Sequence, residues 1–359
     1  MHHKRAGRHA LGHLIIPHPT VRAVTVHLLT PVLMCLGMGL AYIGAFHAPQ
    51  DHAHGLKVAV VGDSARDRLL AQAIKDKAGD TVDVTTLPDR AAARHQIMHR
   101  DLVGAYVPSA KHPELIVADA NSSSSATAAQ DLFTTVAAQQ GDPLKVTDLS
   151  RLASGDPGNQ GLFYVMIALS IGANISAITI CTAGATLAVW LRAALGVGTA
   201  LVVSVIGAVL AGPVFHIVDH DLWGVWGMAW LYTTGILLIG IGLHTFLKRF
   251  TMLALMALFI MLNFTSSGGV FEPELQSGFF GALHAFWNGA GFVEGARSLL
   301  YFPSADLGGR LLSLVLWLVA GLLLLPAAAA VERRGAPAPA HLPAPDTSAE
   351  EELSGALAV

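Results

Sequence analysis

The chain consists of long apolar runs and one polar stretch. An apolar run covers residues 23–46, and five more follow the polar stretch, at residues 162–181, 195–215, 222–246, 250–264 and 307–329. All but the run at 250–264 approach the roughly 20 residues that a helix needs to cross a bilayer. We therefore predict an α-helical membrane protein with six transmembrane helices, TM1 to TM6, in a chain of 359 residues.

Residues 47–160 have a different pattern, in which short strand-like runs alternate with helical ones. The runs LKVAVVG, TVDVTTL, LVGAYVP, ELIVADA and LKVTDL have the length and composition of strands. Ser64 and Asp67 fit a capping box that opens a helix after the first run. Residues 88–100 and 126–140 have helical patterns. We predict an inserted α/β domain that is tethered at both ends to TM1 and TM2.

The basic residues outside this domain indicate the orientation of the chain in the membrane. Nine of these eleven residues precede TM1, follow TM2, separate TM4 from TM5 or follow TM6: Lys4, Arg5, Arg8, Arg22, Arg192, Lys248, Arg249, Arg333 and Arg334. Arg297 and Arg310 are the exceptions on the outer side. Cytoplasmic loops are rich in Lys and Arg. This predicts a cytoplasmic N-terminus (1–22), TM1 (23–46), an extracytoplasmic α/β domain (47–160), a five-helix transmembrane domain (161–330) and a disordered cytoplasmic tail (331–359).

Composition and motifs narrow the function. Charged residues make up 13% of the chain, about half the share of an ordinary soluble protein. Of the 22 basic and 25 acidic residues, 11 and 14 lie between residues 47 and 160. The net charge of −3 gives no basis for nucleic-acid binding. The chain has no phosphate loop and no motif of a serine or zinc hydrolase. We therefore predict no enzyme activity and no cofactor in this chain.

Two groups of histidine and aspartate offer atoms that metals bind. One follows TM1 and consists of His47, Asp51, His52 and His54. The other lies between TM3 and TM4, where His216 and His220 have the spacing of one helix face, next to Asp219 and Asp221. A solvated linker and a solvated turn account for the same residues. We predict no metal and keep His216 and His220 as candidate ligands.

The segment after TM5 has an unusual composition. Residues 263–302 hold too many Gly, Pro and polar residues for a simple span and too many aromatic residues for an ordinary outer loop. Non-helical backbone at membrane depth is tolerated only where protein or a water-filled cavity covers it. We predict a re-entrant helix-break-helix hairpin over residues 265–302. Glu294 and Arg297 can pair on its second helix, either buried or facing lipid headgroups.

The same segment carries a series of spaced motifs. They comprise an Asn and a Ser-Gly-Gly, a P-x-E-L with Gly-Phe, an L-H-x-F, and an acidic residue and an Arg before Tyr-Phe. The residues are Asn263, Ser267, Gly268, Gly269, Pro273, Glu274, Leu275, Gly278, Phe279, Leu283, His284, Phe286, Glu294, Arg297, Tyr301 and Phe302. This segment resembles the outer hairpin of type-2 ABC-transporter permeases. Phe264, Gln276, Ser277 and Ala285 depart from that pattern. A single span, a large outer domain and five further spans resemble the phage-infection-protein-like (Pip-type) branch of this family.

The resemblance implies a permease subunit, homodimeric or heterodimeric, in the bacterial cell membrane. Such a subunit moves a lipid, glycan, peptide or drug-like substrate outward and is powered by ATP in a separate cytoplasmic ATPase. The resemblance places the ATPase contact between TM2 and TM3, where Trp190 and Arg192 fit a short interfacial helix at residues 184–196. Asn174 and Ser176 are candidates for the substrate path or for helix packing. A non-transporting scaffold or surface receptor, acting through the outer domain, is the alternative.

Overall fold

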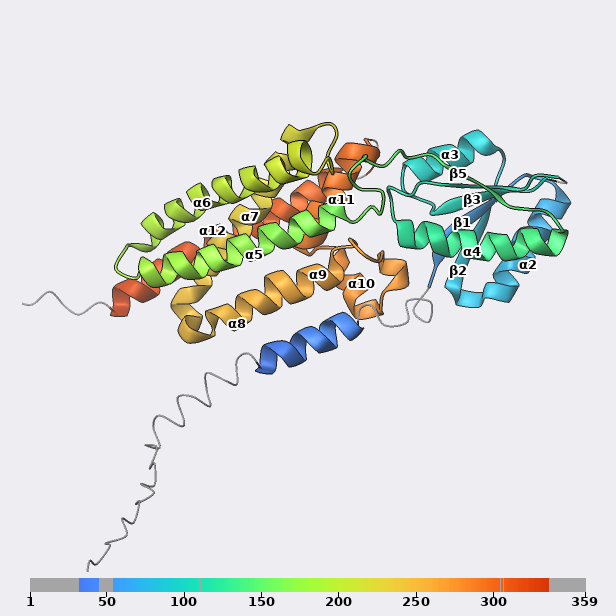
Figure 1. Cartoon of the computed structure of the whole chain (residues 1–359). Coiled ribbons are helices and arrows are strands. Elements are labelled where there is room, and N and C mark those ends of the chain that lie inside the picture. Colours follow the sequence, from blue (N-terminus) through green and yellow to red (C-terminus); the bar gives the residue numbers. More distant parts are fainter. Residues whose placement is uncertain (1–31, 45–53, 110, 304, 306, 336–359) are drawn as a thin grey trace, which may run out of the picture.

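The computed structural model describes residues 32–44, 54–109, 111–303, 305 and 307–335. The molecule is elongated, with a bundle of long helices at one end and the α/β domain at the other (Figure 1). The predicted basic N-terminus, the tail after residue 335, and His47, Asp51 and His52 lie outside the described residues.

The α/β domain contains every predicted strand. These are β1 (Leu56–Val61), β2 (Val82–Leu87), β3 (Gly104–Val107), β4 (Glu114–Val117) and β5 (Lys145–Asp148). They form one sheet in the order β2-β1-β3-β4-β5, in which only β3 and β4 pair antiparallel. The start of β1 and the end of β4 therefore share the edge of the sheet that faces the helical bundle.

Three helices cover the two faces of this sheet. Helices α2 (Ala65–Ala78) and α4 (Ser123–Gln140) pack on one face, and α3 (Arg90–Met98) packs on the other. The predicted capping box is present, because Ser64 Oγ accepts from the Asp67 N–H and Asp67 Oδ2 accepts from the Ser64 N–H, both at 3.2 Å. Hydrophobic alternation and capping thus account for the order of elements in this domain.

Among the described residues, four helical runs are long and apolar enough to cross a membrane: Gly161–Ala183, Val189–Val214, Leu222–Ser266 and Leu307–Arg334. They correspond to α5 (Gly161–Ala183), to α6 (Val189–Val209) with a π-helical turn (Leu210–Val214), to α7 (Leu222–Leu247) with the helix after it, and to α12 (Leu307–Gly335). A shorter apolar helix, Val32–Gly44, lies within predicted TM1. These lengths and compositions are those of a membrane protein.

The third run contains both predicted TM4 and predicted TM5. After α7, a short turn (Lys248–Phe250) leads into α8 (Thr251–Met256), a π-helical turn (Ala257–Met261) and α9 (Leu262–Ser266). Lys248 adopts the left-handed conformation, with φ of 47°. Residues 251–266 span about 24 Å at 1.5 Å per residue, which is short of a hydrocarbon core of about 30 Å. The broken helix, residues 251–266, is therefore shorter than α7.

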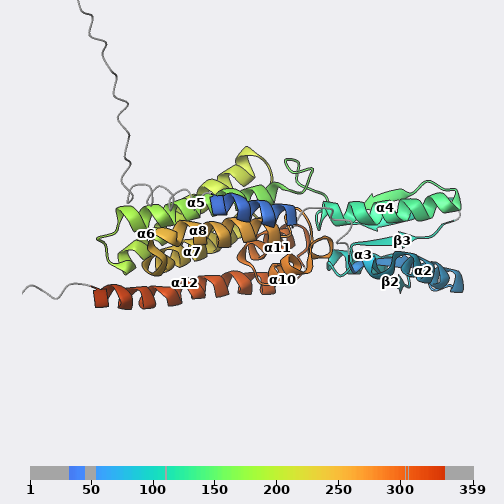
Figure 2. The ribbon, with the colours of Figure 1, turned by 90° about the horizontal axis from the view of Figure 1, so that it is seen from below.

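The predicted helix-break-helix element follows α9. It consists of a single 3₁₀ turn (Pro273–Leu275), α10 (Gly278–His284) and α11 (Asn288–Tyr301). Helix α11 packs against α5, α7, α9 and α12, and its residues from 288 to 298 are all buried. Figure 2 shows α10 and α11 between the long helices and the α/β domain. We call residues 267–302 the hairpin.

Two local predictions are wrong. Residues 184–196 form no separate interfacial helix, because α5 ends at Ala183, a turn follows, and Trp190 and Arg192 already belong to α6. His216 and His220 share no helix face, since they lie in the non-helical turn between the π-helical turn and α7. His216 has a φ of 51°, and the His220 ring instead contacts the Leu300 carbonyl through Nε2 at 2.7 Å.

Candidate functional site

Asn263 fixes the end of the broken helix to two neighbouring helices. Its Nδ2 donates to the Tyr232 hydroxyl of α7 at 2.7 Å, and its Oδ1 accepts from the Gly289 N–H of α11 at 3.0 Å. The Tyr232 hydroxyl also pairs with Ser170 of α5 at 2.6 Å. All these groups are buried. An amide with both a donor and an acceptor therefore ties α5, α7, α9 and α11 together at one point.

Gly268 lets the chain leave α9 without filling the space beneath it. Its φ is +75°, a backbone conformation that residues other than Gly rarely adopt. A Cβ here would lie 2.7 Å from His284 Cε1 and 2.8 Å from Glu294 Oε1. The Gly268 carbonyl accepts from Arg297 Nη1 at 2.9 Å. The glycine therefore serves both the turn and the charged groups packed against it.

The predicted pair of Glu294 and Arg297 is buried, with exposed fractions of 0% and 2%. Arg297 Nη1 donates to Glu294 Oε1 at 2.7 Å and to Glu272 Oε1 at 3.1 Å. The alternative of a pair facing lipid headgroups is therefore wrong. Burying such a pair is costly unless further hydrogen bonds satisfy it, and the Gly268 carbonyl supplies one of these.

A further charged residue, Arg100, reaches Glu272 and Glu294 from the α/β domain. It follows α3 in the left-handed conformation, with a φ of 65°. Its Nη2 forms an ion pair with Glu294 Oε2 and lies 3.9 Å from Glu272 Oε1. Its Nε donates to Asn121 Oδ1 at 2.5 Å, and its guanidinium lies over the Phe302 ring, 5.5 Å from the centroid. Arg100, Glu272, Glu294 and Arg297 form what we call the junction cluster.

Further contacts join the α/β domain to the bundle around this cluster. The Ser124 hydroxyl of α4 donates to the Val270 carbonyl at 3.1 Å, and the His54 N–H donates to the Glu274 carbonyl at 2.9 Å. The Tyr301 hydroxyl accepts from the Ala153 N–H at 3.3 Å. The edge of the sheet is therefore seated on the hairpin at several points, with the junction cluster among them.

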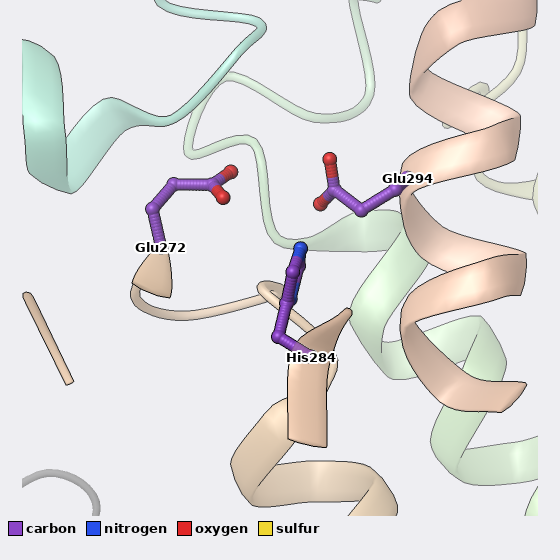
Figure 3. A group of neighbouring side chains, drawn as sticks. All are labelled: Glu272, His284 and Glu294. Carbon is purple, nitrogen blue, oxygen red and sulfur yellow. The ribbon is translucent and has the colours of Figure 1, made fainter. Parts of the chain in front are cut away.

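His284 completes a group of three side chains that point toward one another (Figure 3). One ligand atom from each of Glu272, His284 and Glu294 lies within 4.8 Å of the other two. His284 Nδ1 lies 3.0 Å from the Ser266 carbonyl. Because a carbonyl only accepts, Nδ1 carries the proton, and the neutral ring presents the Nε2 lone pair to the carboxyl groups.

Burial and charge divide the protons among these groups. Burial alone would raise the pKa of Glu294, but Arg100 and Arg297 outweigh it and lower this pKa to about 2. Burial and the neighbouring Glu294 raise the pKa of Glu272 to about 8. Burial lowers the pKa of His284 to about 4. At neutral pH, Glu294 is therefore ionised, Glu272 holds a proton and His284 is neutral.

Two carboxyls and an imidazole are also a donor set that zinc accepts. Here, however, Arg100 and Arg297 already occupy the oxygens of Glu294, and Arg297 donates to Glu272 as well. A divalent cation would enter between two guanidinium groups, which the Coulomb term opposes. The two guanidinium groups therefore make this donor set a poor site for a metal ion.

The remaining predicted site residues lie elsewhere in the bundle. Arg192 is 3% exposed and forms an ion pair with Glu332 of α12, whereas Trp190 is 51% exposed. Asn174 is buried in α5, and neither its Oδ1 nor its Nδ2 has a hydrogen-bond partner among the described residues. Ser176 is half-buried on the same helix. The structure thus does not bring these residues to the junction cluster.

Arg100 is the member of the site that sequence reasoning missed. It lies 194 residues before Glu294, and no motif connects the two. The signal in its neighbourhood is a basic residue at the end of a predicted helix, residues 88–100. Comparisons with known protein families, with curated proteins and with solved structures found no match to this chain.

Proposed function

We propose that this chain is the membrane-spanning permease subunit of an exporter that is driven by a separate cytoplasmic ATPase. Its substrate class is a lipid, glycan, peptide or drug-like molecule moved outward, and two permease chains form the transport unit. The observation that carries the proposal is the hairpin. Its backbone is interrupted, follows a short broken helix and is satisfied by buried side chains. At membrane depth, such backbone is tolerated only where it is buried in protein or lines a water-filled cavity.

The distribution of charge supports the orientation in this proposal. The turn between α5 and α6, the turn at Lys248–Phe250 and the end of α12 lie at the end of the bundle opposite the α/β domain (Figure 1). These places carry Arg192, Lys248, Arg249, Arg333 and Arg334. Positive residues mark cytoplasmic ends, so the α/β domain and the hairpin belong to the outer side.

The cytoplasmic end offers exposed aromatic side chains for an ATPase contact, namely Trp190, Phe246 and Phe250, and Trp190 is the most exposed of the three. Trp190 begins α6 there, while Arg192 is turned inward and fastens α6 to Glu332 of α12. Thr245 of α7 donates to the same Glu332 at 2.9 Å. A force on Trp190 would therefore pass to α6, α7 and α12 together.

Purification of the full chain from its native membranes tests the proposal. We expect an ATPase with a G-x-x-x-x-G-K-[ST] loop to copurify, and Trp190→Ala to lower its yield about tenfold, as loss of an aromatic anchor does. Trp223→Ala is the matched control, because Trp223 is 79% exposed at the opposite end of the bundle. If no ATPase copurifies and vesicles show no ATP-dependent flux, the proposal is contradicted.

A scaffold or surface receptor is the second candidate, and the open edge of the sheet favours it. Strand β5 is an edge strand with mostly exposed residues, so its outer side can pair with an added strand. Deletion of residues 51–159 separates the two functions. The deletion removes Arg100, the partner of Glu294, so the deleted chain also carries Glu294→Gln. A permease keeps its ATPase in this variant, whereas a scaffold has none to keep and loses its outer partner.

A further inference from the structure

A cavity lies beside the junction cluster, between the N-terminus of α4 and the segment that follows α9. It measures about 380 Å³, and Ser123, Ser124, Val270, Phe271, Leu275 and Arg297 contribute to its lining. Its position is between the α/β domain and the hairpin, since Ser124 bonds directly to the Val270 carbonyl. One wall is thus a helix start and the other is the hairpin.

The helix start offers backbone donors to this cavity. Helix α4 is 18 residues long, and its N-cap, Ser122, uses its hydroxyl to satisfy the Ser125 N–H. The N–H groups of Ser123 and Ser124 belong to the first turn, where an α-helix supplies no acceptor of its own. These donors point outward from the end with partial positive charge, which suits an anion.

Arg297 supplies a second and independent donor. Its side chain is 98% buried, and Nη1 holds the Gly268 carbonyl, Glu272 and Glu294. Its Nε, by contrast, has no hydrogen-bond partner among the described residues. Arg297 lines this cavity, whereas Glu272 lines a different one, of about 320 Å³, on the other side of the cluster. A buried charged donor without a partner costs free energy. A ligand that accepts from Nε removes this cost, which favours its binding.

The charge around the cavity also favours an anion. Arg100 and Arg297 bring two guanidinium groups to the junction cluster, and burial together with Glu294 raises the pKa of Glu272 and so favours its neutral form. The acidic residue in the lining is Asp131. It lies about 12 Å further along α4 than Ser123, at 1.5 Å per residue, and is exposed to solvent.

The geometry points to a binding site for a phosphate group, formed by the first turn of α4 and the free Nε of Arg297. Val270, Phe271 and Leu275 give the cavity an apolar wall next to these donors. A phosphodiester headgroup of a lipid, with its acyl chains along this wall, and a free phosphate ion share the chemistry of the site. The inference does not depend on transport, since a scaffold with this junction would bind the same group.

The test uses the full chain in nanodiscs and counts retained lipids by native mass spectrometry. Ser123→Asp places a carboxylate in the phosphate position and favours the helix dipole, so the fold is retained. Thr134→Asp adds the same charge at an exposed position of α4, away from the cavity. We expect phosphatidylglycerol to be retained over phosphatidylcholine at least about tenfold by the native chain and by Thr134→Asp, and this preference to disappear in Ser123→Asp.

Inorganic phosphate distinguishes the two sources of the ligand. If millimolar phosphate displaces phosphatidylglycerol and chloride at the same ionic strength does not, the site binds the free ion. If the lipid stays bound, the site binds a headgroup. Either result supports the phosphate site. Equal lipid retention by Ser123→Asp and Thr134→Asp, or no preference for phosphatidylglycerol in the native chain, overturns it.

Discussion

Removing Arg100 tests whether the junction cluster holds the α/β domain on the hairpin. The Glu294 side chain is fully buried and has two cationic partners, Arg100 and Arg297. Loss of one partner from a buried pair typically costs about 3–5 kcal/mol. Because Arg297 remains to neutralise Glu294, we expect Arg100→Gln to lower the free energy of opening of the junction by about 3 kcal/mol, the lower end of that range.

A double-mutant cycle separates the ion pair from other effects of the substitution. Glu294→Gln removes the opposite partner, and the double variant removes both. We expect a coupling energy of about 1–3 kcal/mol between the two positions, as for residues in one network. Arg100→Gly should be milder than Arg100→Gln by about 1 kcal/mol, because glycine relieves the left-handed backbone at this position.

Native-state hydrogen exchange of the full chain measures these energies where they arise. The amides to follow are those of α3, of α11 and of the start of β1, since these segments meet at the junction. Arg94→Gln is the matched control, because Arg94 is an exposed arginine on α3. Single effects of Arg100→Gln and Glu294→Gln that simply add within about 0.5 kcal/mol would refute the reasoning.

Three further predictions concern the hairpin and the cytoplasmic end. The pKa of Glu272 is raised from 4.5 to about 8 in the folded protein. Its contribution to stability is therefore complete below pH 4.5 and is lost as the pH rises through 8. Thermal unfolding from pH 6 to 9 should show this loss in the native chain and less of it in Glu272→Gln. Gly268→Ala should destabilise the hairpin by about 2–3 kcal/mol through strain and overpacking, and Gly278→Ala, where an added Cβ meets nothing within 4 Å, should not; urea unfolding compares them. Glu332→Gln leaves the buried Arg192 without its ion-pair partner and should loosen α12 in hydrogen exchange more than Arg192→Gln, which leaves a Glu332 side chain that is 34% exposed; equal loosening would contradict this.

The sequence predicted the elements of the α/β domain because its signals there are local. Short runs that contain β-branched or aromatic residues mark the strands, and the Ser64–Asp67 capping box marks the start of α2. The hairpin was also predictable, since glycine and proline interrupt an apolar pattern at residues 263–302. Each of these signals acts over a few residues.

Other features depend on contacts between distant segments, which no local pattern encodes. The pair of Arg100 and Glu294 forms only after the sheet has placed the end of α3 on the hairpin. Arg192 looked like a residue at the membrane edge, but packing of α6 against α12 turns it toward Glu332. His216 and His220 have helical spacing, yet His216 itself adopts the left-handed conformation and the chain turns there.

The junction cluster holds the α/β domain and the hairpin as one unit. Pulsed electron spin resonance between labels at Gln139 and Trp223, both exposed, tests it most directly in a full chain in which Cys35 and Cys181 have been replaced. We predict a single narrow distance distribution for this chain and a broad one after Arg100→Gln. Equally narrow distributions in both would contradict the account.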